Sequence, residues 1–165
     1  MIYLNKMLSR EACVERYGPI DLASLHWPNA PMWIKMVSIE PNVFTNWHVV
    51  GTNSPVTHIA ANIDMHKPLA DALNLIVNKG LQSQLFTFDG CYNIRPVRGG
   101  NQMSAHSWGL AIDINAQSNR LGMQPSMSQE LVQCFEQMGF DWGGKFHRMD
   151  GMHFSYCFEG PRNGA

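Results

Sequence analysis

The sequence predicts an α+β fold in which a small, mostly antiparallel sheet is flanked by helices. Residues 110–114 and 153–158 alternate large apolar side chains with small or polar ones, as strands with one buried face do. Apolar residues recur at helical spacing over residues 69–77 and 131–138. The chain has 165 residues, 45% of them hydrophobic and 15% charged, which is the size and composition of one globular domain.

The N-terminal extension, residues 1–58, is expected to contain a short helix and two strands. A Gly-Pro pair ends the helix predicted over residues 9–17. Residues 32–39 and 43–50 are predicted to be strands, with a Pro-Asn turn between them. The tryptophans of this extension either line a substrate groove or, as is more common for aromatic residues, cover the core.

The clearest helix is expected in the middle of the chain. Pro68 suits its first turn and Gly80 suits its C-terminal cap. Residues 85–88 then predict a strand, which Asp89-Gly90 would end in a turn. This helix is expected to cover one face of the sheet.

A second helix is predicted after a loop over residues 115–125. Ser126 and Gln129 have the spacing of a capping box, and Gly139 ends the apolar stripe that follows. A further strand over residues 140–144 is expected to lead into a turn.

The residues that could carry chemistry lie in two separate segments. His106 lies in a predicted turn, and Asp113 lies on the polar face of the strand over residues 110–114. Asp150 precedes His153 by three residues, and His153 lies on the polar face of its own strand. Side-by-side pairing of the two strands would bring the two histidines and Asp113 together.

Two imidazoles, one carboxylate and an open position are the composition of a catalytic zinc site, because structural zinc sites are usually closed by four ligands. Asp150 would then accept the proton of a water molecule that the metal activates. The alternative is that these side chains are hydrogen-bonded core and turn residues.

The motif residues resemble those of VanY-type zinc D-alanyl-D-alanine carboxypeptidases and of their phage relatives, the L-alanyl-D-glutamate endopeptidase endolysins. The matching pattern is Ser104-x-His106-x6-Asp113 followed by Asp150-x-x-His153. Residues 89–95 and 139–144 also match, within a likeness that covers about residues 59–158. The motifs are specific in combination.

The resemblance implies the hedgehog-like fold of the D-Ala-D-Ala peptidases and one bound Zn²⁺ ion. It implies His106, Asp113 and His153 as the metal ligands and Asp150 as the general base. It also implies Arg95 as the cation that holds a carbonyl or carboxylate of the substrate.

Five further residues are candidates for substrate contact or for support of the site: Ser104, Trp108, Trp142, His147 and Arg98. Each has a structural alternative. The serine could orient the neighbouring histidine or only shape the turn, and the tryptophans could wall the cleft or pack in the core. The histidine and the arginine could be exposed loop residues.

The function that the resemblance implies is hydrolysis of a peptide bond in peptidoglycan stem peptides by a bacteriolytic, endolysin-type L-alanyl-D-glutamate endopeptidase. One alternative is a D-alanyl-D-alanine carboxypeptidase, which needs a pocket for a terminal carboxylate. The other is a non-catalytic, zinc-stabilised module that binds the cell wall.

Composition limits the other partners. The formal net charge of −1 provides no basic field for nucleic acid or anionic lipid, and no apolar run approaches membrane-spanning length. Four scattered cysteines predict reduced, buried thiols. Because no apolar segment of the signal-peptide type is seen near the N-terminus, we expect synthesis in the cytoplasm and delivery to the wall by another, holin-like protein. A monomer is expected.

Overall fold

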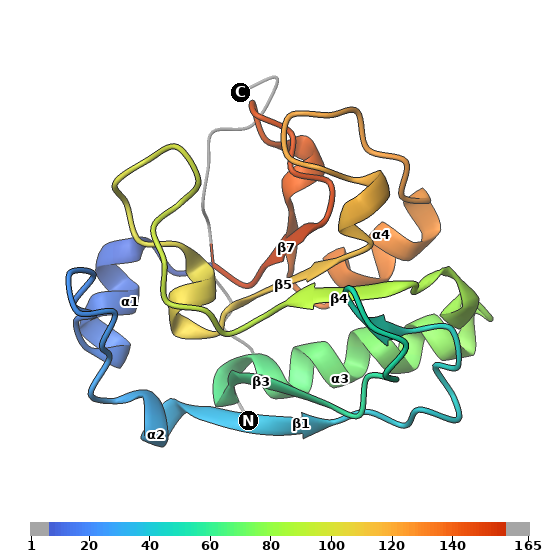
Figure 1. The fold of residues 1–165 in the computed structure, drawn as a ribbon, viewed down its shortest axis with the longest axis horizontal. Coiled ribbons are helices and arrows are strands. Elements are labelled where there is room, and N and C mark those ends of the chain that lie inside the picture. The colour runs from blue at the N-terminus through green and yellow to red at the C-terminus, as the bar shows by residue number, and fades with distance from the viewer. Residues whose placement is uncertain (1–6, 158–165) are drawn as a thin grey trace.

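The computed structural model of the protein describes residues 7–157 and contains a mixed five-stranded sheet with helices beneath and beside it (Figure 1). The helices are α1 (Arg10–Tyr17), α2 (Ala30–Trp33), α3 (Ile63–Asn78) and α4 (Gln129–Glu136). The strands are β1 (Ile34–Ser38), β2 (His48–Val49), β3 (His58–Asn62), β4 (Thr87–Gly90), β5 (Ala111–Ile114), β6 (Asp141–Trp142) and β7 (His153–Ser155). Short 3₁₀ turns cover Gln82–Gln84, Ala105–Trp108, Ala116–Ser118 and Gly143–Lys145.

The main sheet has the strand order β2-β4-β5-β7-β6. The pairings β4–β5, β5–β7 and β7–β6 are antiparallel, as the sequence predicts, whereas the pairing of β2 with β4 at one edge is parallel. Strands β1 and β3 form a separate antiparallel pair. Within residues 7–157, no helix combines the length and the apolar character that crossing a membrane requires.

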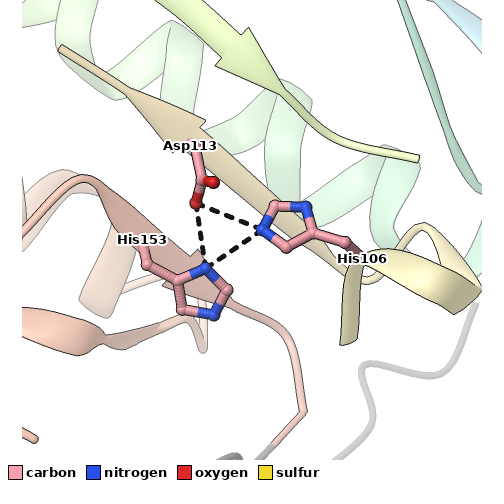
Figure 2. Close-up of side chains that lie close together, drawn as sticks. All are labelled: His106, Asp113 and His153. Atoms are coloured by element: carbon pink, nitrogen blue, oxygen red, sulfur yellow. Dashed lines mark hydrogen bonds and ion pairs between the residues drawn. The ribbon is translucent and has the colours of Figure 1, made fainter. Parts of the chain in front are cut away.

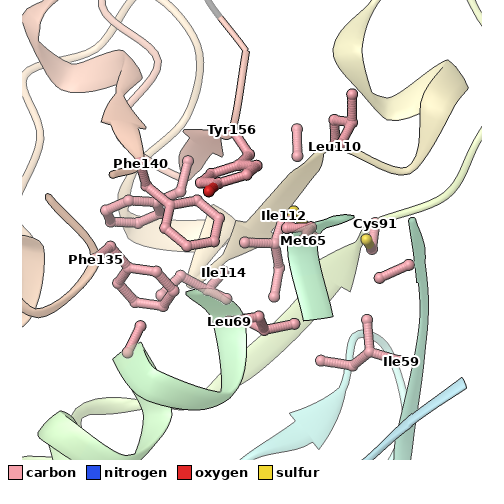
Figure 3. Close-up of a cluster of buried hydrophobic side chains, with 14 of the residues drawn as sticks. Ile59, Met65, Leu69, Cys91, Leu110, Ile112, Ile114, Phe135, Phe140 and Tyr156 are labelled. Atoms are coloured by element: carbon pink, nitrogen blue, oxygen red, sulfur yellow. The ribbon is translucent and has the colours of Figure 1, made fainter. Parts of the chain in front are cut away.

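The hydrophobic core lies between the sheet and the helices α3 and α4 (Figure 3). The predicted inward face of β5 is confirmed, because Leu110, Ile112 and Ile114 are fully buried there. Phe135 of α4 stacks on Phe154 of β7, with ring centroids 4.3 Å apart. Because this face is filled, the opposite faces of β5 and β7 are left for polar side chains.

Helix α1 forms as predicted, and it is attached to the start of α3. The side chain of Ser9 caps α1, and Gly18 follows its last residue with a φ of 89°. Tyr17 is fully buried and its hydroxyl donates to Asp64 Oδ2 at 2.8 Å. Arg16 Nε donates to the same oxygen, also at 2.8 Å. This clamp joins the N-terminal extension to the rest of the fold.

The predicted start of the middle helix is wrong. Helix α3 begins at Ile63, where Asn62 Oδ1 accepts a hydrogen bond from the N–H of Asp64 at 3.0 Å. Pro68 therefore lies inside the helix, where it removes one backbone hydrogen bond. Its burial beside Leu69 provides packing that offsets this loss.

The strand predicted over residues 43–50 is wrong except for β2. The N–H of Trp47 donates to the carbonyl of Phe44, three residues earlier, at 3.0 Å, which is turn geometry. Both rings are buried, with their centroids 5.8 Å apart. The apolar residues of this stretch therefore pack from successive turns. The strand predicted over residues 32–39 begins only at Ile34, after α2.

Three other predicted boundaries also shift. Strand β4 continues through Asp89 and Gly90, which were expected to form a turn, and a bulge accommodates them. Helix α4 is capped by Ser128, whose Oγ accepts from the N–H of Leu131 at 3.2 Å, and not by Ser126. The strand expected over residues 140–144 is limited to β6.

Candidate metal centre

Strand pairing brings the two sequence segments together at one point. Asp113 of β5 lies directly opposite His153 of β7 in the antiparallel register. His106 enters from the 3₁₀ turn that precedes β5. Figure 2 shows the three side chains converging from β5, β7 and this turn.

The turn that carries His106 depends on a glycine at its end. Gly109 has a φ of 66°, and a Cβ at this position would lie 2.7 Å from Ile34 Cδ1 and 2.9 Å from the backbone nitrogen of Asn62. Glycine therefore allows the chain to reverse against the β1–β3 pair and deliver His106 to the head of β5.

The three donor atoms are close together and shielded from solvent. Asp113 Oδ1 lies 2.9 Å from His153 Nδ1 and 3.2 Å from His106 Nε2, and the two nitrogens are 3.1 Å apart. The exposed fractions are 2% for His106, 6% for Asp113 and 4% for His153. Within residues 7–157, these three side chains form the group with metal-ligand spacing, and one donor atom from each lies within 4.8 Å of the others.

The protonation pattern of His106 fits a metal better than a set of mutual hydrogen bonds. His106 Nδ1 lies 2.7 Å from the carbonyl oxygen of Cys91, which can only accept, so this nitrogen carries the proton. Neutral His106 therefore directs the lone pair of Nε2 toward Asp113 and His153. A cation between the donors would satisfy these lone pairs together.

The electrostatics keep the carboxylate ready to bind a metal. Burial by itself would raise the pKa of Asp113, but His106 and His153 outweigh it when their imidazoles are protonated and hold the pKa well below the usual range. Asp113 is therefore ionised at neutral pH. Two imidazoles and one carboxylate are the donor set of a catalytic zinc site with one position open.

Asp150 lies beside this group on a tight turn. Its backbone N–H donates to the carbonyl of Gly143 at 2.8 Å, and its own carbonyl accepts from the N–H of His153 at 3.1 Å. A Cβ on Gly143 would lie 2.5 Å from the Asp150 carbonyl oxygen and 3.2 Å from His153 Cβ. Glycine at 143 therefore permits the close approach that places Asp150 next to the donor group.

The Asp150 carboxyl has the properties of a proton acceptor. Its Oδ1 is buried and has no hydrogen-bond partner within residues 7–157. Burial raises the pKa of Asp150 more than the nearby His153 and Arg98 lower it. A desolvated carboxylate with an uncommitted oxygen takes up a proton more readily than an exposed one.

Two cavities adjoin the donor group. The first, of about 210 Å³, reaches His153 and Asp150, and its other charged or ionisable lining residues are Arg95, Arg98, His147 and Arg148. The second is larger, about 640 Å³, and reaches Asp113. The two cavities share Arg98 and Leu121. We call this pair of adjoining cavities the cleft.

The structure places the other predicted site residues at different depths. Ser104 is buried, lines the first cavity and caps the turn through its Oγ, which accepts from the N–H of His106 at 3.3 Å. Arg95 also lines this cavity, and its Nη1 donates to the carbonyl of Pro96 at 3.2 Å. His147 is exposed at the cavity's rim.

The two predicted tryptophans are buried and line neither of these cavities. Trp108 is 1% exposed and belongs to the core. Trp142 Nε1 donates to the carbonyl of Gly151 at 2.8 Å. Trp142 therefore supports the turn between Asp150 and His153 from the core side.

Several supporting residues carry no sequence signal for chemistry. Cys91 acts through its backbone carbonyl, which any residue could supply. Asn119 is 1% exposed, and its Oδ1 accepts from the N–H groups of Ser126 and Met127. Its carbonyl accepts from the N–H of Met152 at 3.1 Å, next to His153. An asparagine in a polar loop does not by itself indicate such a role.

Comparison with known proteins agrees with this geometry. Residues 98–156 match the model of a family described as D-alanyl-D-alanine carboxypeptidase. The matched segment contains His106, Asp113, Asp150 and His153, whereas Arg95 precedes it. Comparisons with curated proteins and with solved structures gave no match. The buried donor group and the match over residues 98–156 together indicate a metallopeptidase, and that segment is similar to the D-alanyl-D-alanine carboxypeptidase family.

Proposed function

We propose that the protein is a zinc-dependent peptidoglycan hydrolase, an endolysin-type enzyme that cleaves the L-alanyl-D-glutamate bond of stem peptides. The observation that carries this proposal is the cleft formed by the two cavities, one reaching Asp150 and His153 and the other Asp113. A cleft whose two cavities both reach the donor group suits a peptide that continues on both sides of the scissile bond.

The residues of the site would divide the chemistry between them. His106, Asp113 and His153 would hold the zinc ion, which when bound supplies Lewis acidity to the substrate carbonyl and acidifies water. Asp150 Oδ1 would accept a proton from the attacking water and return it to the leaving amine nitrogen. The C–N bond breaks, and the oxygen of the water remains in the new carboxyl group. Arg95 would steady the substrate carbonyl from the first cavity.

A D-alanyl-D-alanine carboxypeptidase is the second candidate, because this is the activity in the description of the matched family. The first cavity also holds Arg95 and Arg148, either of which could pair with a terminal carboxylate. The two activities differ in their products. A carboxypeptidase releases free alanine, whereas the endopeptidase cuts the stem and leaves a new glutamyl amino terminus.

The test is digestion of purified peptidoglycan from several wall types, with the released fragments identified by mass spectrometry. The proposal expects cut stem peptides with new glutamyl amino termini, and no release when a chelator is present. Release of free alanine alone would replace the endopeptidase by the carboxypeptidase. Fragments that appear equally with and without chelator would contradict both candidates.

A further inference from the structure

Arginine side chains gather around the cleft, although the net charge of the whole chain is −1. Arg95, Arg98 and Arg148 line the first cavity, and Arg98 and Arg120 line the second. Arg98 is therefore the arginine at the junction of the two cavities, next to the place where a scissile bond would lie between Asp150 and Asp113. A guanidinium group offers a planar fork that fits a carboxylate.

The guanidinium of Arg98 is not committed to another part of the protein. Within residues 7–157 it forms no hydrogen bond and no ion pair, and the residue is exposed. Arg16 and Arg95 differ in this respect, because the first pairs with Asp64 and the second donates to the carbonyl of Pro96. All the donors of the Arg98 guanidinium are therefore available to a ligand in the cleft.

The loop that carries Arg98 is braced by Arg148, which lines the same cavity. Arg148 Nη1 donates to the carbonyl oxygen of Arg98 at 3.3 Å. Gly99 has a φ of 79°, and a Cβ there would lie 3.2 Å from the same Nη1, so the guanidinium of Arg148 lies close against the loop. The N–H of Gly100 closes the turn by donating to the carbonyl of Val97 at 3.0 Å. Arg98 is thus presented from a defined turn.

The acidic residues of the cleft have other roles. Asp89 Oδ2 accepts from Thr87 Oγ1 at 2.6 Å and from the N–H of Ala116 at 3.1 Å. Asp113 belongs to the donor group and Asp150 is the candidate base. The cleft therefore has anionic groups with assigned tasks. At its junction lies a cation whose charge lowers the pKa of the nearby Asp150 and whose N–H groups remain open to the substrate.

We propose that Arg98 recognises a free carboxylate of the substrate next to the scissile bond. This inference rests on the proposed function, and it narrows the substrate class to stem peptides in which this carboxyl group is not amidated. In an L-alanyl-D-glutamyl substrate, the group is the α-carboxylate of the glutamyl residue. An amide at that position would offer neither the charge nor the second acceptor oxygen that a guanidinium fork engages.

The experiment uses two synthetic stem tetrapeptides that differ only in whether the glutamyl α-carboxyl group is free or amidated. The zinc-loaded protein is expected to cleave the free acid with a kcat/KM about tenfold or more above that of the amide, the usual scale for one charge-assisted hydrogen bond. In Arg98→Gln this ratio should fall to about one, because the free acid loses about tenfold more activity than the amide. Any effect of the lost charge on Asp150 is common to both peptides and leaves the ratio unchanged.

Arg120→Gln is the matched control, because Arg120 lines the second cavity but not the junction. The Arg120→Gln substitution removes one positive charge from the cleft, as Arg98→Gln does. Its kcat/KM can therefore fall for both peptides, but the preference for the free acid should persist. A preference lost equally in both variants would overturn the assignment to Arg98, because general attraction of anions would then explain it. Equal cleavage of the two peptides by the unmodified protein would overturn the inference outright.

A binding measurement can test this inference independently of the proposed function. A ketomethylene analogue of each peptide cannot be cleaved, so its Kd is measurable even if the peptides are not substrates. Tighter binding of the free acid, lost in Arg98→Gln and kept in Arg120→Gln, would support the carboxylate site. Equal Kd values for the two analogues would contradict it. Absence of cleavage by the unmodified protein would count against the proposed function alone.

Discussion

Asp150 is the proposed general base and His106 a proposed zinc ligand, so their substitution should separate catalysis from metal binding. Asp150→Asn keeps the size of the side chain and leaves the three donors in place, so the protein should still bind zinc. Its turnover should fall by about 100-fold to 10,000-fold, because the general base is lost. His106→Ala should lose zinc as well as activity. Zinc content and peptide hydrolysis, measured on the same samples, check both expectations. Full activity in Asp150→Asn would show that another group is the base.

The half-buried position of Asp150 predicts a pH dependence. Because burial raises its pKa, the ionised form that accepts a proton is lost at a higher pH than for an exposed aspartate. We expect kcat/KM to fall as the pH is lowered through this raised pKa and to level off above it. A profile of kcat/KM against pH measures the midpoint. A midpoint at or below the value of an ordinary aspartate would contradict the role assigned to burial.

Substitution of Gly143 tests whether its close contact with the turn that carries Asp150 matters. In Gly143→Ala the new Cβ would lie 2.5 Å from the Asp150 carbonyl oxygen, so the turn must move. We expect a loss of about 1–3 kcal/mol in the free energy of unfolding, together with reduced turnover. Chemical denaturation and peptide hydrolysis report the two effects.

Gly100→Ala is the matched control for this substitution. Its Cβ would meet nothing closer than 3.8 Å, so stability and turnover should change little. Equal effects of the two alanines would mean that crowding against the Asp150 turn is not the cause.

At the level of single residues, the sequence predicts the donors better than their supports. Alternation along two short strands is enough to place Asp113 and His153 on the same face, and their direct pairing follows from the antiparallel register. The carbonyl of Cys91 and the side chain of Asn119 act on the site through contacts distant in sequence. Such contacts leave no periodic pattern, so the sequence alone could not indicate them.

At the level of elements, the junction of α1 with α3 should contribute to stability without contributing to catalysis. Tyr17→Phe removes a buried hydroxyl that donates to the Asp64 carboxylate at 2.8 Å. We expect the free energy of unfolding to fall by about 1.5–3 kcal/mol, the range for hydrogen bonds to charged groups. Chemical denaturation measures this loss. An unchanged free energy of unfolding would show that this hydrogen bond does not stabilise the fold. A loss of kcat without a loss of stability would assign α1 a role in the site.

Helices are the elements that the sequence predicts best. Helices α1, α3 and α4 are all present, but the starts of α3 and α4 were misplaced, because Asn62 and Ser128 cap them in place of the expected cues at Pro68 and Ser126. Short strands were harder to predict. Phe44 and Trp47 belong to an apolar stretch that could be a strand. In the structure the same residues are buried from turns, so the apolar pattern alone does not distinguish the two.

At the level of the whole molecule, the donor group joins β5, β7 and the turn that precedes β5. If zinc binds the folded protein and not the unfolded chain, it stabilises the fold by mass action. The gain in the free energy of unfolding is about 2.7 kcal/mol when the free zinc concentration is 100 times the Kd. Removing the metal with a chelator should therefore lower Tm, and returning zinc should restore it. Calorimetry of the two forms provides the comparison, and identical Tm values with zinc shown to bind would contradict the structural coupling.

The most direct test of the account is zinc-dependent cleavage of peptidoglycan. The protein would be stripped with a chelator, dialysed, and assayed before and after one equivalent of Zn²⁺ is returned, with Asp150→Asn treated in parallel. We predict that fragment release stops in the stripped protein and returns with zinc, and that it does not return in Asp150→Asn although that protein binds zinc again. Undiminished release by protein shown to contain no metal would contradict the metallopeptidase mechanism.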